Sequence, residues 1–244
     1  MRKITFFVFL LLATITYKLD AQSFYGSSSG EMILSFSNAA YHGSPYNPGE
    51  TVSVSDAPRF TVWFHTSSYL NMDFGEHFGL YTGLGIRNIG FITKEKSSDI
   101  TINENVKWKR RSYTMGIPFA FKIGNMNGFY FFAGGQYDWL FHYKEKEFLN
   151  SGKRKYSEWF SKRVNTFLPS VFVGFTLPSD LSIKFTYTLE SFMNKDYSYV
   201  DHNGDLVKPY ENMDSKIYYI SVFYNAKWTN YIEKETTVKK VAVL

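Results

Sequence analysis

Cysteine is absent from this chain of 244 residues, which excludes disulfide bridges and thiolate metal sites. Histidine is scarce, and its five residues are scattered along the chain. The sequence contains no His-Glu-x-x-His zinc motif, and it has no glycine-rich phosphate loop. We therefore expect a protein that is not an enzyme, with no catalytic residue, no cofactor and no bound metal.

The chain also lacks a strong excess of charge of one sign. Its formal net charge is +5, and Arg2, Lys3 and Lys18 against Asp20 account for two of these positive charges, which leaves +3 for the rest. Nucleic-acid-binding domains carry a concentrated basic patch, whereas this remainder is small and evenly spread. We expect no nucleic-acid partner.

Long hydrophobic runs are missing, apart from one at the start of the chain. "MRK" is a positive leader, "ITFFVFLLLATITY" is an apolar run, and "LDA" ends in a small residue before Gln22. This pattern predicts a secretory signal peptide over residues 1–21, cleaved before Gln22. The alternative, an uncleaved anchor, is less favoured because a membrane-spanning helix needs about 20 apolar residues.

Alternation of apolar and polar residues with a period of two runs from Glu31 to Trp228, as is typical of β-strands. Long polar connections alternate with short ones, a pattern typical of an up-and-down barrel with one elaborated rim. We predict an all-β fold, an eight-stranded antiparallel up-and-down transmembrane β-barrel with short periplasmic turns and long extracellular loops. The expected strands are residues 31–40, 58–70, 78–92, 108–123, 129–143, 166–177, 181–193 and 215–228. The expected organisation is a short periplasmic lead-in at 22–30, a barrel at 31–228 and a periplasmic C-terminal tail at 229–244.

The orientation of the strands decides between a membrane barrel and a soluble barrel, which would place its apolar residues inside. In the last expected strand, Ile220 and Val222 lie between tyrosine and tryptophan residues toward both ends, as in interfacial aromatic girdles. Glycine and alanine share the polar side of several strands, where they relieve crowding inside a narrow barrel. Together with the signal peptide, these features favour apolar residues outside, against lipid.

Pro118 lies in the middle of an expected strand, although proline cannot donate to a β-ladder. A closed barrel has no edge strand to accommodate it. We therefore expect Pro118 at a bulge, or at a position where a missing ladder bond is tolerated.

The segment around Pro118, "YTMGIPFAFKIG" followed by "FYFFAGGQYDWLF", resembles the signature of the PorT-like family of outer-membrane β-barrel proteins. In that family a Tyr-x-x-x-Ile-Pro strand ending near a lysine precedes a glycine-rich strand. The matching residues here are Tyr113, Ile117, Pro118, Lys122, Gly134 and Gly135. The resemblance implies eight strands over nearly the whole mature chain, and a role accessory to protein secretion or gliding. The end of the chain differs from the usual pattern. Outer-membrane barrels often finish on a terminal aromatic residue, whereas here residues 229–244 follow Trp228.

An eight-stranded barrel is just wide enough for side chains to fill its interior. The polar side of the strands supplies charges of both signs, so we predict salt bridges across a filled lumen rather than a pore. The expected lumen residues are Glu31, Arg59, His65, Arg87, Arg110, Lys122, Asp138, His142, Lys184, Glu190 and Lys227. Asp138 and His142, four residues apart on one expected face, are the pair that an outer-membrane enzyme would use, and a hydrogen-bonded structural pair is the favoured interpretation.

The long loops are the remaining candidates for binding. Residues 144–163 are rich in basic residues interleaved with aromatic ones, which suits lipopolysaccharide phosphates or an acidic partner, although a simply solvated loop is the simpler interpretation. The candidate binding residues are Lys153, Arg154, Lys155, Trp159, Lys162 and Arg163. In the fourth loop, "DHNGD" hints at calcium but lacks the ligand spacing of an EF-hand loop.

The sequence thus favours a non-catalytic protein in the outer membrane of a Gram-negative bacterium, with a structural or interaction role in the cell envelope. Its expected partners are outer-membrane lipid, lipopolysaccharide, and envelope or secretion-machinery proteins. Two alternatives remain open: a small passive channel, and an enzyme that modifies lipid or peptide.

Overall fold

The structure is a computed structural model that describes residues 22–42, 51–53, 55–96, 105–149, 152–200 and 202–228. The predicted signal peptide at 1–21 and the predicted tail at 229–244 lie outside these residues. Within the described part of the chain, no helix is long and apolar enough to cross a membrane.

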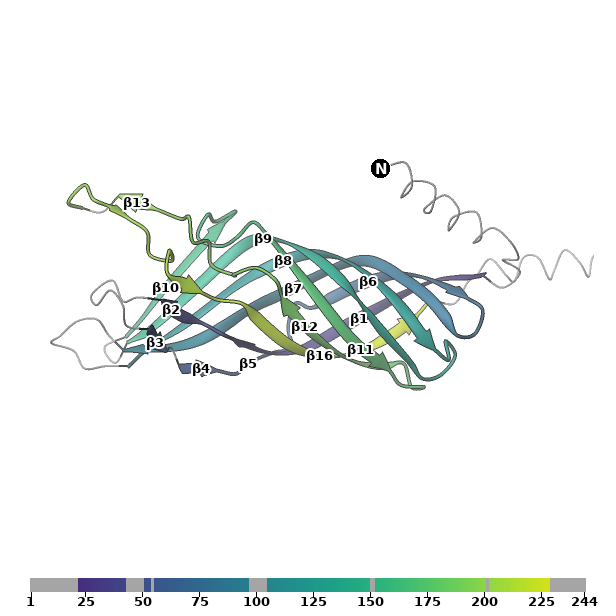
Figure 1. Ribbon diagram of the computed structural model, residues 1–244. Helices are drawn as coiled ribbons and strands as arrows, with labels where there is room; N and C mark the ends of the chain where they lie inside the picture. Colours follow the sequence, from purple (N-terminus) through teal and green to yellow (C-terminus); the bar gives the residue numbers. More distant parts are fainter. Residues whose placement is uncertain are drawn as a thin grey trace, which may run out of the picture.

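Eight long strands pair side by side in a ring, and each pairing is antiparallel (Figure 1). Around the ring the order is β9, β11, β12, β16, β1, β6, β7 and β8, and β8 pairs with β9 again. The predicted all-β, eight-stranded antiparallel fold is confirmed. The eight strands are β1 (Gln22–Ser37), β6 (Thr66–Phe74), β7 (Phe78–Lys96), β8 (Asn105–Gly124), β9 (Tyr130–Leu149), β11 (Phe167–Thr176), β12 (Leu181–Thr188) and β16 (Ile217–Lys227).

Shorter strands decorate one end of the ring, which we call the outer end because it carries the long connections. They are β2 (Ala40–His42), β3 (Thr51–Ser53), β4 (Ser55–Ala57), β5 (Arg59–Thr61), β10 (Gly152–Trp159), β13 (Tyr199–Val200), β14 (Leu206–Val207) and β15 (Met213–Asp214). At the opposite end, the described residues form the tight connections 75–77, 125–129 and 177–180. The expected alternation of long and short connections is therefore present.

Two boundaries differ from the sequence-based expectation. Residues 22–30, expected as a periplasmic lead-in, belong to β1 and pair with β6 along their whole length, so that expectation is wrong. The expected strand at 58–70 is divided into β5 and β6, and Phe64 between them has a φ of 67°. The misplaced start has a simple cause: "QSFYGSSSG" contains six glycine and serine residues and little apolar alternation, so it does not look like a strand.

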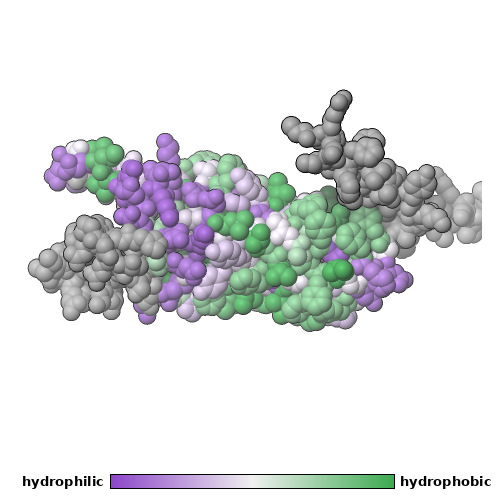
Figure 2. All heavy atoms as spheres, viewed as in Figure 1, coloured by the Kyte–Doolittle hydropathy of each residue, from purple (hydrophilic) through white to green (hydrophobic). Residues whose placement is uncertain are grey.

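The apolar side of the strands faces outward, as predicted. In β8, Phe121 and Ile123 are 54% and 65% exposed, whereas Lys122 between them is completely buried. Figure 2 shows hydrophobic residues gathered over the barrel wall and hydrophilic ones at the end that carries β10 and β13. Because water would disfavour such a surface, the outside of this barrel is suited to lipid.

Pro118 faces the lumen and is buried. Gly83 and Leu84 of β7 are not paired with β8, and this interruption lies opposite Pro118 and Ile117. The register of the two strands is the same on both sides of the interruption. Thr82 Oγ1 donates a hydrogen bond to the Pro118 carbonyl oxygen at 2.8 Å. Of the two expected arrangements, the missing ladder bond is therefore the one present.

Candidate functional site: a filled lumen and a basic outer rim

The centre of the lumen holds an ion cluster built on Glu31 of β1. Its carboxylate lies 3.1 Å from Arg87 of β7 and 3.3 Å from Lys184 of β12, and all three side chains are buried. The Tyr69 hydroxyl on β6 donates to the same carboxylate at 3.3 Å. These strands come from different sides of the ring, so the cluster crosses the lumen as predicted for a filled barrel.

Asp138 of β9 extends this cluster to the far wall. Its carboxylate lies 3.8 Å from Arg87 Nη1 and accepts hydrogen bonds from Gln136 at 2.5 Å and Thr114 at 3.4 Å. Gly116 lies beside it, and a Cβ at this glycine would be 2.1 Å from Asp138 Oδ1. The small residue on the polar side of β8 thus makes room for a charge, as the sequence reasoning expected.

A second charged group lies toward the end with the short turns. Lys122 forms a buried ion pair with Asp73 of β6, and its Nζ also donates to Asn71 Oδ1 at 3.2 Å and to the Tyr25 hydroxyl at 3.1 Å. Lys122 was predicted in the lumen, but its partner Asp73 was not. Asp73 lies in residues 71–77, which the sequence predicted to connect two strands. In the structure it belongs to β6.

A third charged group lies toward the outer end. Arg110 Nε is 3.3 Å from Glu145 Oε2, and its Nη1 donates to Thr93 at 3.2 Å. The Tyr143 hydroxyl donates to the same Glu145 oxygen at 2.6 Å. The sequence did not predict Glu145 in the lumen, because residues 144–165 were expected to form a loop. The alternating residues "KEKE" at 144–147 are part of β9 and are the pattern that could have indicated it.

Arg59 and His65 are buried, but they bind the barrel wall rather than the central ions. The Arg59 guanidinium donates to the Asn88 side chain at 2.7 Å and to the Asn88 carbonyl oxygen at 3.1 Å. His65 Nδ1 faces the Asn88 N–H at 3.3 Å, and its Nε2 lies 3.2 Å from Thr61 Oγ1. Both residues brace the irregular junction between β5, β6 and β7.

Two predicted lumen residues lie on the surface instead. Glu190 is exposed and follows the end of β12 at Thr188, so it has left the alternating part of the strand. Lys227 is exposed at the end with the short turns, where its Nζ lies 2.9 Å from Asp180. Their assignment to the lumen network was wrong because strand alternation was extended to the strand ends.

His142 does not share a face with Asp138. The pairing of β8 with β9 shifts by one residue between Tyr113 and Thr114, because Tyr113 is opposite His142 and Thr114 is opposite Leu140. After this bulge, Tyr143 faces inward, whereas His142 points to the outward side, where it is buried against Trp159 with 4.0 Å between the ring centroids. The predicted Asp138–His142 pair is therefore not formed, and the two residues cannot share a proton.

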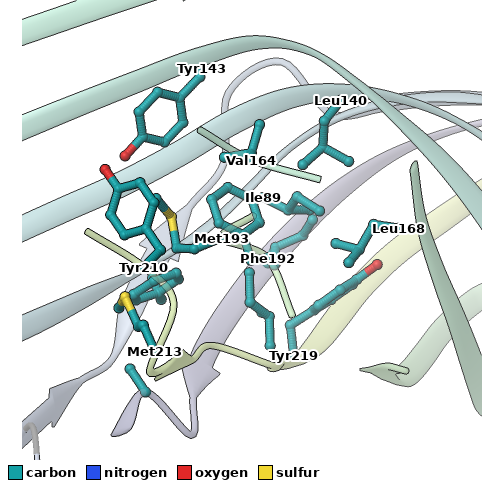
Figure 3. Close-up of a cluster of buried hydrophobic side chains, with 14 residues drawn as sticks. Ile89, Leu140, Tyr143, Val164, Leu168, Phe192, Met193, Tyr210, Met213 and Tyr219 are labelled. Atoms are coloured by element: carbon teal, nitrogen blue, oxygen red, sulfur yellow. The ribbon is translucent and has the colours of Figure 1, made fainter. Parts of the chain in front are cut away.

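Above the ion cluster, a buried hydrophobic cluster fills the outer half of the lumen (Figure 3). Phe192, Met193, Tyr210 and Met213 come from the connection between β12 and β16, and each is almost completely buried. They pack against wall residues that include Ile89, Leu140, Leu168 and Tyr219. The fourth long connection was expected as an extended surface loop, but part of it folds into the barrel and closes it.

The residues of the PorT-like motif lie together on β8 and β9. Tyr113, Ile117 and Gly135 face outward, whereas Pro118 and Lys122 face inward. Gly134 also faces inward, opposite Ala120, and a Cβ there would be 2.0 Å from the Phe119 carbonyl oxygen. A glycine is therefore needed at position 134 for the close approach of the two strands.

The basic segment 144–163 is not a free loop. Residues 144–149 continue β9, and β10 pairs back on them, so the two strands project beyond the ring at the outer end. We call the projecting sheet the outer extension; it comprises Asn105–Arg111 of β8, His142–Leu149 of β9 and the whole of β10. Figure 1 shows these strands running past the barrel.

The outer extension separates the six predicted binding residues. Lys153, Lys155 and Trp159 share the outward face of β10, whereas Arg154 lies on the other face, 3.7 Å from Glu147. Lys162 is exposed beyond the strand. Arg163 is packed against the rings of Tyr156 and Tyr197, with its guanidinium carbon 4.3 Å and 5.4 Å from their centroids, and is not available as a surface cation.

No three His, Asp or Glu side chains among the described residues come close enough to hold a metal ion. Of the acidic residues in the fourth connection, Asp196 and Glu211 are exposed, and Glu211 pairs with Lys208 at 3.6 Å. Asp201, the first residue of "DHNGD", lies outside the described residues.

Comparison with known proteins finds likeness among solved structures only. No family model matches the chain, and no curated protein does. The chain is similar to Ail, the attachment invasion locus protein of Yersinia pestis, whose structure was solved in complex with the heparin analogue sucrose octasulfate. The two sequences are 11% identical, the match covers 83% of this chain and 99% of Ail, and the TM-score is 0.33. It is also similar to Neisserial surface protein A, with 9% identity over 84% of this chain and 98% of that one and a TM-score of 0.34. For the Escherichia coli outer membrane protease OmpT, the identity is 11%, the coverage 85% and 96%, and the TM-score 0.41.

Proposed function

We propose that this protein is a non-catalytic barrel of the Gram-negative outer membrane that acts through its outer end and conducts no solute. The observation that carries the proposal is the occupied lumen. Glu31, Arg87, Lys184 and Asp138 form a layer of buried charges across the barrel, and the hydrophobic cluster around Phe192 lies above it. A solute would have to break several buried ion pairs to pass.

Planar-bilayer recording of the mature protein tests this part of the proposal. Insertion is checked first by flotation with liposomes and by protection from added protease. We expect no conductance steps from inserted protein, because the charges are paired and the space above them is filled. Discrete steps that scale with the amount of inserted protein would support the channel alternative and overturn the proposal.

The separation of Asp138 from His142 supports a non-catalytic role. General acid–base chemistry needs the two groups within hydrogen-bond reach, and here they point to opposite sides of the barrel wall. The test is to compare lipid A composition and peptide cleavage in cells that express the wild type or the Asp138→Asn variant. We expect no difference; a product that is lost in the variant would favour the enzyme alternative.

An interaction role is supported by the hairpin of β13 and β14. Val200 and Leu206 are directly opposite each other in this hairpin and are 65% and 66% exposed, and Tyr199 beside them is 45% exposed. Figure 1 shows the hairpin standing away from the barrel. A contiguous exposed apolar group of this kind is typical of a contact surface for another protein.

On the resemblance of the β8–β9 segment to the PorT-like family, the partner we propose is an envelope protein of a secretion or gliding machine. A photo-crosslinking residue at Leu206 tests this in native membranes, with the same residue at lipid-facing Ile123 as a matched control. We expect envelope proteins to be captured at Leu206 and not at Ile123. The same adducts at both positions would contradict a specific contact at the hairpin.

A further inference from the structure

The outward face of the outer extension carries rows of cations directly opposite one another. Lys146 of β9 pairs with Lys109 of β8 on one side and with Lys155 of β10 on the other. Directly opposite residues of antiparallel strands have Cβ atoms about 4.5–5.5 Å apart on the same face, and like charges there are destabilising. A row of three lysines in this register is difficult to explain by stability alone.

Neighbouring rows repeat the pattern. Above the central row, Lys107 and Lys153 flank Phe148, with their Nζ atoms 5.9 Å and 5.1 Å from its ring centroid. Below it, Arg111 is directly opposite Lys144. The basic face of the outer extension therefore consists of Lys107, Lys109, Arg111, Lys144, Lys146, Lys153 and Lys155.

The carboxylates of the outer extension lie on its other face. Glu145 and Glu147 alternate with the lysines of β9, and Glu158 alternates with the outward residues of β10. Glu145 binds Arg110 and Glu147 lies near Arg154, so neither neutralises the basic face. On the outward face of the described residues of these three strands, no acidic side chain is present.

Mutual repulsion on the basic face is reflected in the ionisation of its central residues. Burial and the positive charges of Lys153, Arg111, Lys155 and Lys144 lower the pKa of Lys146. Burial, followed by the positive charges of Arg59, Arg111, Lys146 and Lys107, lowers the pKa of Lys109. Within the part of the chain that the structure describes, no carboxylate pairs with the cations of this face, and an external anion would relieve the repulsion.

The position of the basic face identifies the source of that anion. It continues the lipid-facing side of the barrel, and aromatic side chains lie directly below it: Tyr113, Phe141 and Trp159 are linked by ring contacts of 5.9–6.5 Å. Aromatic girdles of this kind mark the membrane–water interface. Arg111 and Lys109 precede Tyr113 by two and four residues and lie beyond it toward the outer end, about 7 Å and 13 Å along the strand, which is the level of lipid headgroups.

We infer that the basic face of the outer extension binds the phosphate groups of a phosphorylated glycolipid in the outer leaflet, with the acyl chains against the barrel wall below. This inference rests on the proposed outer-membrane location. A soluble acidic protein or a free polyanion would also match the positive charge. A lipid, however, would contact both the basic face, through its phosphates, and the lipid-facing wall below, through its acyl chains. The central row, Lys109, Lys146 and Lys155, would contact phosphate from three neighbouring strands.

The experiment measures binding of diphosphorylated lipid A to the mature protein in neutral detergent, by titration of intrinsic tryptophan fluorescence. The test variant replaces the central row by glutamine (Lys109→Gln, Lys146→Gln, Lys155→Gln). A control variant removes the same number of charges elsewhere at the outer end (Arg154→Gln, Lys162→Gln, Lys195→Gln). Both variants are first checked for the heat-modifiable electrophoretic migration of a folded barrel.

Since each basic residue near an anionic lipid surface changes affinity by about fivefold, we expect the test variant to bind at least about tenfold more weakly than the wild type. The control variant should bind like the wild type, and dephosphorylated lipid A should bind the wild type as weakly as the test variant binds lipid A. Equal binding by the test variant and the wild type would overturn the inference. So would a soluble heparin fragment that binds the wild type as tightly as lipid A, because it would show that the membrane is not required.

This experiment and the conductance experiment fail separately. A conducting barrel that binds lipid A through these lysines would refute the filled lumen and retain the lipid site. A barrel that conducts no ions but still binds lipid A after these lysines are replaced would refute the lipid site and retain the filled lumen.

Discussion

Replacement of Glu31 by glutamine should strongly destabilise the barrel. Glu31 is the carboxylate that Arg87 and Lys184 share, at 3.1 Å and 3.3 Å, in a part of the lumen from which water is excluded. In the variant, the two cations would be left with Asp138, which lies 3.8 Å from Arg87. Removal of one partner of a buried ion pair costs about 3–5 kcal/mol. Glutamine keeps the volume and one acceptor oxygen, so we expect about 3 kcal/mol.

The measurement is urea unfolding in lipid vesicles, followed by tryptophan fluorescence and by heat-modifiable electrophoretic migration. A matched control is Lys227→Gln, which removes the exposed ion pair with Asp180 and should cost less than about 1 kcal/mol. The double variant Glu31→Gln, Lys184→Met removes the excess cation, and methionine fits between the rings of Phe172 and Phe223 that now flank the ammonium group. It should be more stable than Glu31→Gln alone. If Glu31→Gln costs no more than Lys227→Gln, the lumen is hydrated and the reasoning fails.

Two further predictions concern the close packing and the orientation of the wall. Gly134→Ala should lower the free energy of unfolding by about 1–3 kcal/mol, because its Cβ would overlap the Phe119 carbonyl oxygen. A Cβ at Gly135 would lie 3.6 Å from the Ser170 carbonyl oxygen, an ordinary contact, so Gly135→Ala should change that free energy by less than about 1 kcal/mol in the same urea assay. Cysteine at Ile123 should react with a bilayer-partitioning reagent, and cysteine at buried Ser221 should not; the opposite pattern would mean that the barrel is turned inside out.

The orientation of each strand could be predicted from the sequence because it depends only on local alternation. Phe121, Lys122 and Ile123 illustrate this: a period of two assigns the lysine to one face, and the barrel geometry makes that face the lumen. The ion-pair partners of the lumen charges could not be predicted in the same way. Lys122 binds Asp73, which is far away in the sequence and is brought beside it by the pairing of β7 with both strands, in which Gly79 is opposite Asp73 on one side and opposite Lys122 on the other.

The fourth long connection shows a second limit of local reasoning. Its many polar residues predicted a solvated loop, and the exposed Asp196 and Glu211 agree with that. Phe192 and Met213, however, lie near its two ends, and only the closed ring creates the apolar space that they fill. Burial of these residues is a tertiary effect, and the pattern of one segment does not contain it.

The bulge opposite Tyr113 and Thr114 has the largest consequence for function, and it is the feature that alternation could not reveal. A shift of one residue moves every later side chain of β9 to the other face. Without it, His142, Lys144 and Lys146 would point inward, and Tyr143 and Glu145 would lie outside against the headgroups. With it, Glu145 meets Arg110 inside, and the lysines join those of β8 and β10 on the outside. The extra residue of this bulge, Phe141, therefore has two effects: it places Glu145 beside Arg110 inside the barrel, and it places the lysines of β9 on the basic face. Deletion of Phe141 should abolish the Glu145–Arg110 ion pair and the basic face at once.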